Sequence, residues 1–405
     1  MPLVVQKYGG TSVGDPSRIR AVAERVARRR KSGDSVVVIV SAMGHTTDEL
    51  IRMARDVTPR HHAREMDMLL TAGERISMAL LAMAIRDNDV EAMSLTGSQA
   101  GILTDTSHGR ARIRDIRAFR VEEGLEAGKV VIVAGFQGVN PDTKEITTLG
   151  RGGSDATAVA MASALGADAC EIYTDVDGVY TADPRLVPEA RKLDEISYDE
   201  MLELAAAGAR VLMERSVEFG KRFGVPIHVR SSFHEGEGTW VKESTMEQTS
   251  VVGIAHDSSV GEITVRALPG GPAALFEALA AEWIRLDLIV QSTPKNGSAD
   301  VSFTVPTEDL ERARSAAESA ASRLGAGLVE VEAGVGRVSL IGSGVASQPG
   351  VAAGVFSVLE DAGIDIRAVS MSPIRVTCVI AEQHVEKAVR RLHEAFDPPT
   401  PMVEP

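Results

Sequence analysis

Two glycine-rich segments have the residue types that suit the binding of a phosphate. Residues 7–13 (KYGGTSV) follow an apolar run, and residues 147–155 (TTLGRGGSD) open an alanine-rich helical pattern that continues to Leu165. A strand–glycine–helix layout turns backbone N–H groups and the N-terminus of a helix toward an anion. Each segment also carries one cation, Lys7 and Arg151, which could offset the charge of a phosphate or a carboxylate. The two segments therefore predict a phosphoryl-transfer site.

Neither segment fits the usual nucleotide-binding signatures. The nearest approach to the pattern G-x-x-x-x-G-K-[ST] runs from Gly124 to Lys129; it is one residue short and is followed by Val130. The sequence therefore favours a phosphoryl-transfer enzyme outside the P-loop and protein-kinase designs.

The composition predicts an acidic, soluble protein of the cytoplasm, and 405 residues allow two or three domains. A net charge of −14 and 4% aromatic residues argue against a nucleic-acid partner, which requires a basic face and stacking platforms. The N-terminal residues lack the pattern of a secretory signal, and no apolar run approaches the ~20 residues that cross a membrane. Cys170 and Cys378 lie in apolar runs and are expected to be buried thiols in a reducing compartment.

The elements that must position the glycine-rich segments alternate along the first 233 residues. Short β-branched runs predict strands, and the stretches between them predict helices. The strands are expected at 36–40, 130–133, 171–174 and 227–230. The helices are expected at 18–31, 76–85, 156–165 and 198–212. This alternation is typical of a mostly parallel sheet that is covered by helices on both faces.

A sheet of this kind binds ligands at the carboxyl ends of its strands. Lys7, Ser41, Thr174 and Asp175 lie at or just past such ends. We therefore expect these four residues to belong to one site.

The C-terminal part contains a weak internal repeat. In each copy a strand leads through a glycine turn, at 270–272 or 348–350, into a helix, two strands and a second helix. This order predicts two small ferredoxin-like modules. The expected divisions are a catalytic domain at 1–234, a linker at 235–250, the two modules at 251–331 and 332–397, and a disordered tail at 398–405.

Three segments have a structural interpretation beside the functional one. Residues 71–74 fit a capping box with Glu74 at its third position, and the pattern alone favours capping there. Asp155 could be a plain N-cap. Residues 174–180 (TDVDGVY) begin like a calcium loop but lack its later ligands, so a turn that holds a nucleotide is the better interpretation. The histidines and cysteines have no zinc-binding spacing, and no metal ligand is assigned.

Taken together, five segments resemble the aspartokinase family. They are 7–13, 40–44 (VSAMG), 73–74, 148–155 and 173–185 (YTDVDGVYTADPR). The resemblance covers nearly the whole chain, because the two C-terminal modules are similar to the tandem ACT domains of that family. It implies an α/β fold: an amino acid kinase α/β/α sandwich with a mainly parallel sheet, followed by two ferredoxin-like (βαββαβ) ACT domains.

The resemblance also implies an activity, which is the ATP- and Mg²⁺-dependent phosphorylation of the L-aspartate β-carboxylate to 4-phospho-L-aspartate. This is the first step of lysine, threonine and methionine biosynthesis. A β-carboxylate with a pKa near ~3.9 is already ionised at neutral pH, so the reaction needs no general base. It needs in-line positioning and neutralisation of the charge on the moving phosphoryl group.

The resemblance assigns roles to individual residues. Lys7 would stabilise the phosphoryl group, helped by the N–H groups of Gly9 and Gly10, and Asp155 would organise Lys7, the substrate and the metal. Arg151 would clamp the α-carboxylate of aspartate, and Glu74 would bind the α-ammonium group, which reverses the capping interpretation. The further substrate contacts would be Ser41, Thr47 and Ser154. The ATP pocket would be lined by Thr174, Asp175, Tyr180, Arg185 and Arg210.

The chain departs from the family pattern in places. Arg210 stands where lysine is usual, and the pair 213–214 (ME) has no chemistry that the sequence assigns. The effector loop at 268–272 (LPGGP) lacks the usual acid, so inhibition by lysine, threonine or both stays open. The candidate effector residues are Gly271, Gln291, Gln348 and Gly350.

Two statements about assembly follow from the resemblance and from the exposed strand edges of ACT units. We expect a homo-oligomer that forms through the ACT domains. Met246 could serve as an internal start for a shorter, ACT-only subunit. Two other functions remain alternatives: a kinase of another amino acid on the same scaffold, and an amino-acid sensor with a silent kinase domain.

Overall fold

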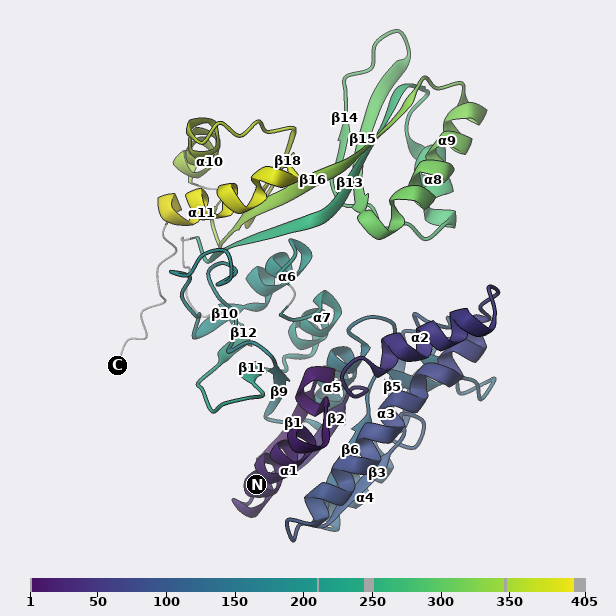
Figure 1. Cartoon of the computed structure of the whole chain (residues 1–405), viewed down its shortest axis with the longest axis vertical. Coiled ribbons are helices and arrows are strands. Elements are labelled where there is room, and N and C mark those ends of the chain that lie inside the picture. Colours follow the sequence, from purple (N-terminus) through teal and green to yellow (C-terminus); the bar gives the residue numbers. More distant parts are fainter. Residues whose placement is uncertain (1, 210, 244–250, 346–347, 397–405) are drawn as a thin grey trace.

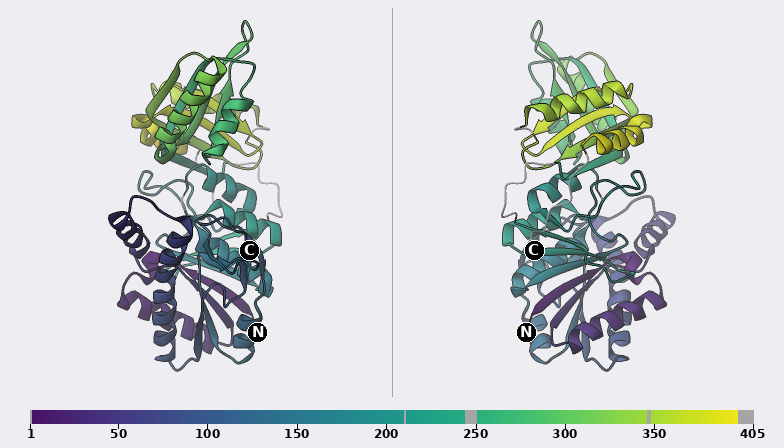
Figure 2. Two further views of the ribbon diagram at one scale, coloured as in Figure 1. Left: turned by 90° about the vertical axis from the view of Figure 1, so that its right-hand side faces the viewer. Right: turned by 90° about the vertical axis from the view of Figure 1, so that its left-hand side faces the viewer.

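The computed structural model describes residues 2–209, 211–243, 251–345 and 348–396, which form two parts (Figure 1). Residues up to 243 form an α/β part. Residues from 251 form a second part that is stacked on the first (Figure 2).

The centre of the first part is an eight-stranded sheet in the order β10-β12-β11-β9-β1-β2-β6-β3. Its strands are β1 (Leu3–Tyr8), β2 (Ser35–Val40), β3 (Ala92–Leu95), β6 (Val130–Ala134), β9 (Ala169–Thr174), β10 (Glu195–Ser197), β11 (Ile227–Ser231) and β12 (Thr239–Lys242). Neighbouring strands are parallel except β11 and β12. Tyr8 is in register with both Val40 and Tyr173, so the carboxyl ends of the central strands meet at one edge. The predicted, mostly parallel sheet is confirmed.

Helices cover both faces of this sheet. On one face lie α1 (Pro16–Lys31) and α3 (Ala63–Arg86), whose apolar residues share a core with β1, β2 and β6. The other face is covered by α4 (Phe119–Glu126), α5 (Gly153–Leu165), α6 (Tyr198–Ala206) and α7 (Glu214–Phe223). Helix α2 (Thr46–Val57) packs against α3. The arrangement is the expected α/β/α sandwich.

The start of α1 shows how the local sequence fixes the chain beside the end of β1. The side chain of Asp15 accepts hydrogen bonds from the backbone N–H groups of Ser17 and Arg18, and Pro16 occupies the first helical position. The short 3₁₀ helix η1 (Gly10–Val13) lies between β1 and this cap. The glycine turn is therefore held between two well-defined elements.

A smaller, four-stranded sheet in the order β5-β4-β7-β8 accompanies the large one. Its strands are β4 (Ile102–Thr104), β5 (Ile113–Ile116), β7 (Gln137–Val139) and β8 (Ile146–Thr148). Strand β8 leads directly into the glycine-rich turn that precedes α5. The position of that turn therefore depends on the small sheet.

The second part is a six-stranded antiparallel sheet in the order β14-β15-β13-β16-β18-β17. Its strands are β13 (Gly253–Pro269), β14 (Ile289–Gln291), β15 (Ser298–Pro306), β16 (Val329–Ile341), β17 (Ala368–Ser372) and β18 (Arg375–Ala381). One apolar core joins β13 and β15 to α8 (Ala273–Ala281) and α9 (Leu310–Leu324). Another joins β16 and β18 to α10 (Pro349–Asp361) and α11 (Val385–Phe396). The two predicted modules are thus confirmed as a pair that shares one sheet.

Strand pairing shows how closely the two modules are joined. Residues 260–269 of β13 pair with β15, whereas residues 253–257 pair with residues 337–341 of β16. Each long strand therefore runs through both modules. The boundary at 331/332 stays a prediction.

Three sequence-based expectations need correction. Residues 71–74 lie in the interior of α3, so the capping box is wrong: a helix already hydrogen-bonded on both sides has no free N–H groups for Thr71 to cap. Helix α6 ends at Ala206 because Gly208 has a φ of +113°, and it does not reach 212. Within the expected linker, β12 is a strand of the large sheet in which every second residue is buried.

Other expectations have mixed outcomes. Cys170 and Cys378 are buried thiols, as predicted. Arg210, Met246 and the tail at 398–405 lie outside the described residues. Helix α3, with 24 residues, is long and apolar enough to cross a membrane by length and composition, a test that core helices also pass.

Candidate active site

The centre of the candidate site is an ion pair between two residues that the sequence analysis singled out. Lys7 lies near the end of β1, and Asp155 lies in the first turn of α5. The Lys7 Nζ atom is 2.6 Å from Oδ1 of Asp155, with only 12% and 10% of the two side chains exposed. A cation is thus held where the N-terminus of α5 meets the carboxyl edge of the sheet, a position that suits an anionic ligand.

The glycine turn after β1 lies directly beside this ion pair. The N–H of Gly9 donates to the carbonyl of Tyr173 (3.4 Å), and the carbonyl of Gly10 accepts from Gly44 N–H (3.0 Å). A Cβ atom on Gly10 would lie 2.9 Å from the carbonyl oxygen of Ala42, so only glycine allows this approach of two turns. A Cβ on Gly9 would lie 3.4 Å from the Lys7 ammonium. The structure therefore brings Gly9 and Gly10 to Lys7.

Glu74 faces the same edge from α3. It is 4% exposed, and its Oε1 accepts a hydrogen bond from Ala42 N–H (3.2 Å). Its Oε2 is buried without a hydrogen-bond partner among the described residues. Burial raises the pKa of the Glu74 carboxyl to about 7. A buried carboxylate oxygen without a donor is costly, and a bound cation would satisfy it.

The three candidate hydroxyl residues lie at the end of β2 and in the first turns of α2 and α5. Ser41 follows β2; its backbone N–H donates to Tyr8 (3.1 Å), and its carbonyl accepts from the Ser77 hydroxyl (2.7 Å). Thr47 lies in the first turn of α2. Ser154 is 8% exposed and lies next to Asp155 at the start of α5.

Arg151 does not join the other candidates in this structure. Its side chain is 89% exposed, and its guanidinium lies 3.9 Å from the carboxylate of Glu308 in the second part of the molecule. The neighbouring Gly152 has a φ of +68°, and a Cβ there would lie 2.1 Å from Cγ of Met213. Met213, which had no assigned role, therefore packs against the turn that carries Arg151.

The candidate nucleotide residues follow β9. The Thr174 hydroxyl donates to the Asp175 carboxylate (3.1 Å), and Tyr180 forms an antiparallel bridge with Lys192. Burial, together with the charge of Asp177, raises the pKa of Tyr180. Arg185 is 88% exposed and pairs with Asp183 (2.6 Å). Because Tyr173 is in register with Tyr8, Thr174 lies at the same strand edge as Lys7, whereas Arg185 is exposed in the loop that follows β9.

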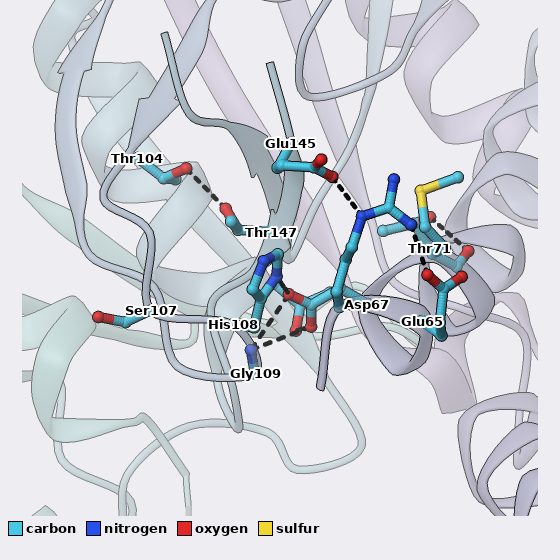
Figure 3. A network of polar contacts seen from close by, with 12 residues as sticks. Glu65, Asp67, Thr71, Thr104, Ser107, His108, Gly109, Glu145 and Thr147 are labelled. Carbon is cyan, nitrogen blue, oxygen red and sulfur yellow. Dashed lines mark hydrogen bonds and ion pairs between the residues drawn. The ribbon is translucent and has the colours of Figure 1, made fainter. Parts of the chain in front are cut away.

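The structure adds one polar cluster that sequence analysis missed. Asp67 on α3 is fully buried and contacts His108 and the backbone of Gly109 in the loop between β4 and β5 (Figure 3). Asp67, Thr71 and Glu74 are spaced at i, i+4 and i+7, which places them on one face of a helix. The sequence did contain a signal for this cluster: Asp67 is an acid inside the apolar run 66–70 (MDMLL), seven residues before Glu74.

No group of three or more His, Cys, Asp and Glu side chains that could hold a metal ion occurs within the described ranges. Mg²⁺ does not require such a group, since it is usually bound by one or two carboxylates together with substrate phosphates. Asp155, beside Lys7, is the carboxylate that fits this arrangement.

The candidate effector residues lie in separate elements of the second part. Gly271 precedes α8, and Gln291 ends the edge strand β14. Gln348 is the N-cap residue of α10, and Gly350 lies in the first turn of that helix. Their role stays a prediction.

A parallel sheet with a lysine–aspartate pair and glycine turns at its carboxyl edge, joined to paired ferredoxin-like modules, defines an amino acid kinase with ACT domains. The amino acid kinase family model matches residues 2–231, and an ACT domain model matches residues 338–396. The chain belongs to the aspartokinase family.

Sequence similarity to known proteins extends over nearly the whole chain. The aspartokinase of Mycolicibacterium smegmatis is 52% identical over 405 residues, covering 98% of this chain and 96% of that protein. The Geobacillus stearothermophilus aspartokinase is 51% identical over 401 residues, covering 98% and 97%.

Solved structures agree with this assignment. E. coli aspartokinase III in complex with aspartate and ADP (R-state) is 26% identical and has a TM-score of 0.83, covering 98% of this chain and all of that one. The same enzyme in complex with lysine and aspartate (T-state) is 27% identical and has a TM-score of 0.76, covering 97% and 99%.

Proposed function

We propose that the chain transfers the γ-phosphoryl group of ATP to the β-carboxylate of L-aspartate, forming 4-phospho-L-aspartate at the start of lysine, threonine and methionine biosynthesis. The observation that carries the proposal is the buried Glu74 carboxylate, one oxygen of which has no hydrogen-bond partner in the described part of the chain, at the same strand edge as the Lys7–Asp155 pair. An aspartokinase needs a cation at the phosphoryl group and an anion for the ammonium group of its substrate, and these residues supply both.

The acceptor amino acid would be held at both ends of its α-carbon. Its ammonium group would pair with Glu74, and its α-carboxylate would draw the Arg151 guanidinium inward, away from Glu308. That exchange is feasible because the Arg151–Glu308 pair is exposed and long, a geometry that contributes little energy. Ser41, Thr47 and Ser154 would add hydrogen bonds.

The phosphoryl group would move along the Lys7 side of the site. Lys7 would stabilise the charge on its equatorial oxygens, and the N–H of Gly10 in the glycine turn would add a donor. The residues after β9, Thr174, Asp175, Tyr180 and Arg185, would line the ATP pocket, with Arg210 as a further contact. When bound, Mg²⁺ would neutralise phosphate charge, and Asp155 is the residue suited to hold it.

Hydroxylamine trapping tests this proposal, because an acyl phosphate reacts with hydroxylamine to give a coloured hydroxamate. We expect hydroxamate from Mg-ATP with L-aspartate and little from L-glutamate. Product from glutamate alone would show a different acceptor. The absence of product from either acid, with amino acids still binding in calorimetry, would indicate a sensor with a silent kinase domain.

We further propose that an amino-acid effector, lysine or threonine, controls the kinase through the ACT modules. The first module contacts two segments near the turn that carries Arg151. The Arg110 guanidinium, in the loop between β4 and β5, lies 3.4 Å from the Trp283 ring centroid. Glu214, at the start of α7, pairs with Arg285 at 3.3 Å. The second contacts the nucleotide loop, since His393 lies 2.9 Å from the hydroxyl of Thr181. Under this proposal the modules contact both the loop that would bind the acceptor and the loop that would bind ATP.

The Trp283 contact gives a testable consequence. Trp283 has a φ of +56°, a strained conformation for a bulky residue, and its ring covers Arg110. We expect Trp283→Ala to raise the half-inhibiting effector concentration about tenfold, the scale of a lost cation–π contact, while uninhibited kcat changes little. Leu328→Ala, an exposed residue in the same module, is the matched control. If Trp283→Ala and Leu328→Ala have the same half-inhibiting effector concentration, the contact between Trp283 and Arg110 does not transmit inhibition.

The proposed setting is a cytoplasmic homo-oligomer formed through the ACT modules. The edge strands β14 and β17 leave unpaired backbone groups that favour association. A shorter subunit starting at Met246 remains part of this proposal. A single full-length band from natively expressed protein would argue against that subunit.

A further inference from the structure

Asp67 is a fully buried carboxylate for which the reaction chemistry provides no role. It lies on α3, two helical turns before Glu74. Its oxygens accept from the Thr148 hydroxyl (2.6 Å). They also accept from the N–H of Gly109 (3.0 Å), and Nδ1 of His108 lies 2.6 Å away (Figure 3). Three donors from two other segments of the chain therefore converge on one side chain.

Such an arrangement exceeds what packing requires. Burying a carboxylate is costly unless hydrogen bonds replace its water, so an apolar residue would fill the same space more cheaply. A charge held by three donors fixes their positions strongly, because each bond to an ionised acceptor is about twice as strong as a neutral one. Asp67 therefore specifies a geometry between α3, the loop at 105–112 and the end of β8.

The two segments that Asp67 contacts, the loop at 105–112 and the end of β8, are also hydrogen-bonded to each other next to the turn that carries Arg151. The carbonyl of Thr148 accepts from Ala111 N–H (2.8 Å). Arg215 donates to the carbonyls of Leu149 (3.2 Å) and Ala111 (3.1 Å). Arg151 follows only three residues after Thr148. The Asp67 tie therefore connects the helix that carries Glu74 to the turn that carries Arg151.

We propose that Asp67 is a positioning residue that sets the separation of Glu74 and Arg151 and thereby matches the site to an acceptor of aspartate length. The inference rests on the proposed function, in which these two residues hold the α-ammonium and α-carboxylate groups. With both groups fixed, the side-chain carboxylate reaches the phosphoryl group only at the right chain length. If the Asp67 contacts are weakened, the bound amino acid can shift, and the site discriminates less well against glutamate, which is one methylene longer than aspartate.

The test compares two neighbouring threonines on β8. Thr148→Val removes the hydroxyl that donates to Asp67. Thr147→Val removes an equally buried hydroxyl, which pairs with Thr104 (2.6 Å) and has no hydrogen bond to α3 among the described residues. Asp67→Asn keeps the shape of the tie and removes its charge. All three are measured with aspartate, glutamate and ATP varied in turn.

We expect Asp67→Asn and Thr148→Val to raise the KM for aspartate about tenfold or more, with the KM for ATP nearly unchanged. The ratio of kcat/KM for glutamate to that for aspartate should rise in both. Thr148→Ser, which restores the hydroxyl, should recover aspartate affinity, and Thr147→Val should resemble wild type.

A fall in kcat with an unchanged KM for aspartate would overturn the proposal. So would an equal effect of Thr147→Val, which would show general weakening of the small sheet. Should Asp67→Asn fail to fold, the milder comparison of Thr148→Val with Thr148→Ser decides. Wild-type protein that binds aspartate in calorimetry but forms no hydroxamate would refute the proposed reaction, while the aspartate Kd of the same variants would still test the tie.

Discussion

Replacing Lys7 by methionine is expected to lower kcat by roughly 10²–10³, the scale of losing one preorganised charge stabiliser. The ammonium group lies at the strand edge, paired with Asp155 at 2.6 Å and largely withdrawn from water. In such a site its interaction with phosphoryl oxygens is far stronger than in solution. Methionine fills a similar volume without the charge, so the loss should appear in the chemical step.

The measurement is steady-state hydroxamate formation at saturating aspartate and Mg-ATP. Lys31→Met, at the exposed end of α1, is the matched control and should keep wild-type kcat. Thermal denaturation of both variants separates catalysis from folding, because Lys7→Met leaves Asp155 without its cation. Near-wild-type kcat in Lys7→Met would refute the proposed role.

Glu74→Gln is expected to raise the KM for aspartate by about 100-fold, with a smaller change in kcat. The amide can still accept from Ala42 N–H, so the turn at 41–44 should keep its position. What disappears is the charge that would pair with the substrate ammonium in a buried site, where removing one partner of an ion pair costs about 3 kcal/mol or more. Unchanged aspartate affinity in this variant would place the ammonium group elsewhere.

The raised pKa of Glu74 adds a pH dependence to this prediction. Below about pH 7 the free protein keeps Glu74 protonated, and a neutral carboxyl cannot pair with an ammonium group. The KM for aspartate in wild type should therefore fall as the pH rises from about 6 to about 8. Glu74→Gln should remove this part of the profile, whereas the KM for ATP should follow the same pH course in both proteins.

The stability of the ligand-free protein should change in the same pH range. The folded state holds the Glu74 proton with a pKa of about 7, against an ordinary value of 4.5 for a solvated glutamate, so it binds more protons than the unfolded state between those pH values. Stability should therefore decrease as the pH rises through this window. Comparing the Tm of wild type and Glu74→Gln between these limits isolates the contribution of Glu74.

Much of the candidate site could be predicted because its signals are local. The run 3–5 before Lys7 and the glycines after it predict a strand, a turn and a cation in that order. Parallel strands place their carboxyl ends at one edge, so Ser41 and Thr174 were expected near Lys7. The register of β1 with β2 and β9 confirms that placement.

Residues 213–214, which differ from the family pattern, show what local sequence signals cannot predict. Neither residue had an assigned chemistry, yet Met213 packs on Gly152 and Glu214 pairs with Arg285 of the first ACT module. These contacts join segments that are far apart in the chain. No spacing within 213–214 could indicate them.

Local sequence signals were enough to predict the parallel sheet, the paired modules, the glycine turns and the residue types at the strand ends, because each depends on neighbours within a few positions. The packing of the folded chain was needed to show that Glu74 is a buried acid inside a helix and not a cap. The same holds for the Arg151 side chain, which faces Glu308, and for Asp67, which links α3 to the strand that precedes the Arg151 turn. The physical reason is that burial and ion pairing depend on segments distant in sequence, and these set whether a carboxylate is solvated, paired or left to bind a ligand.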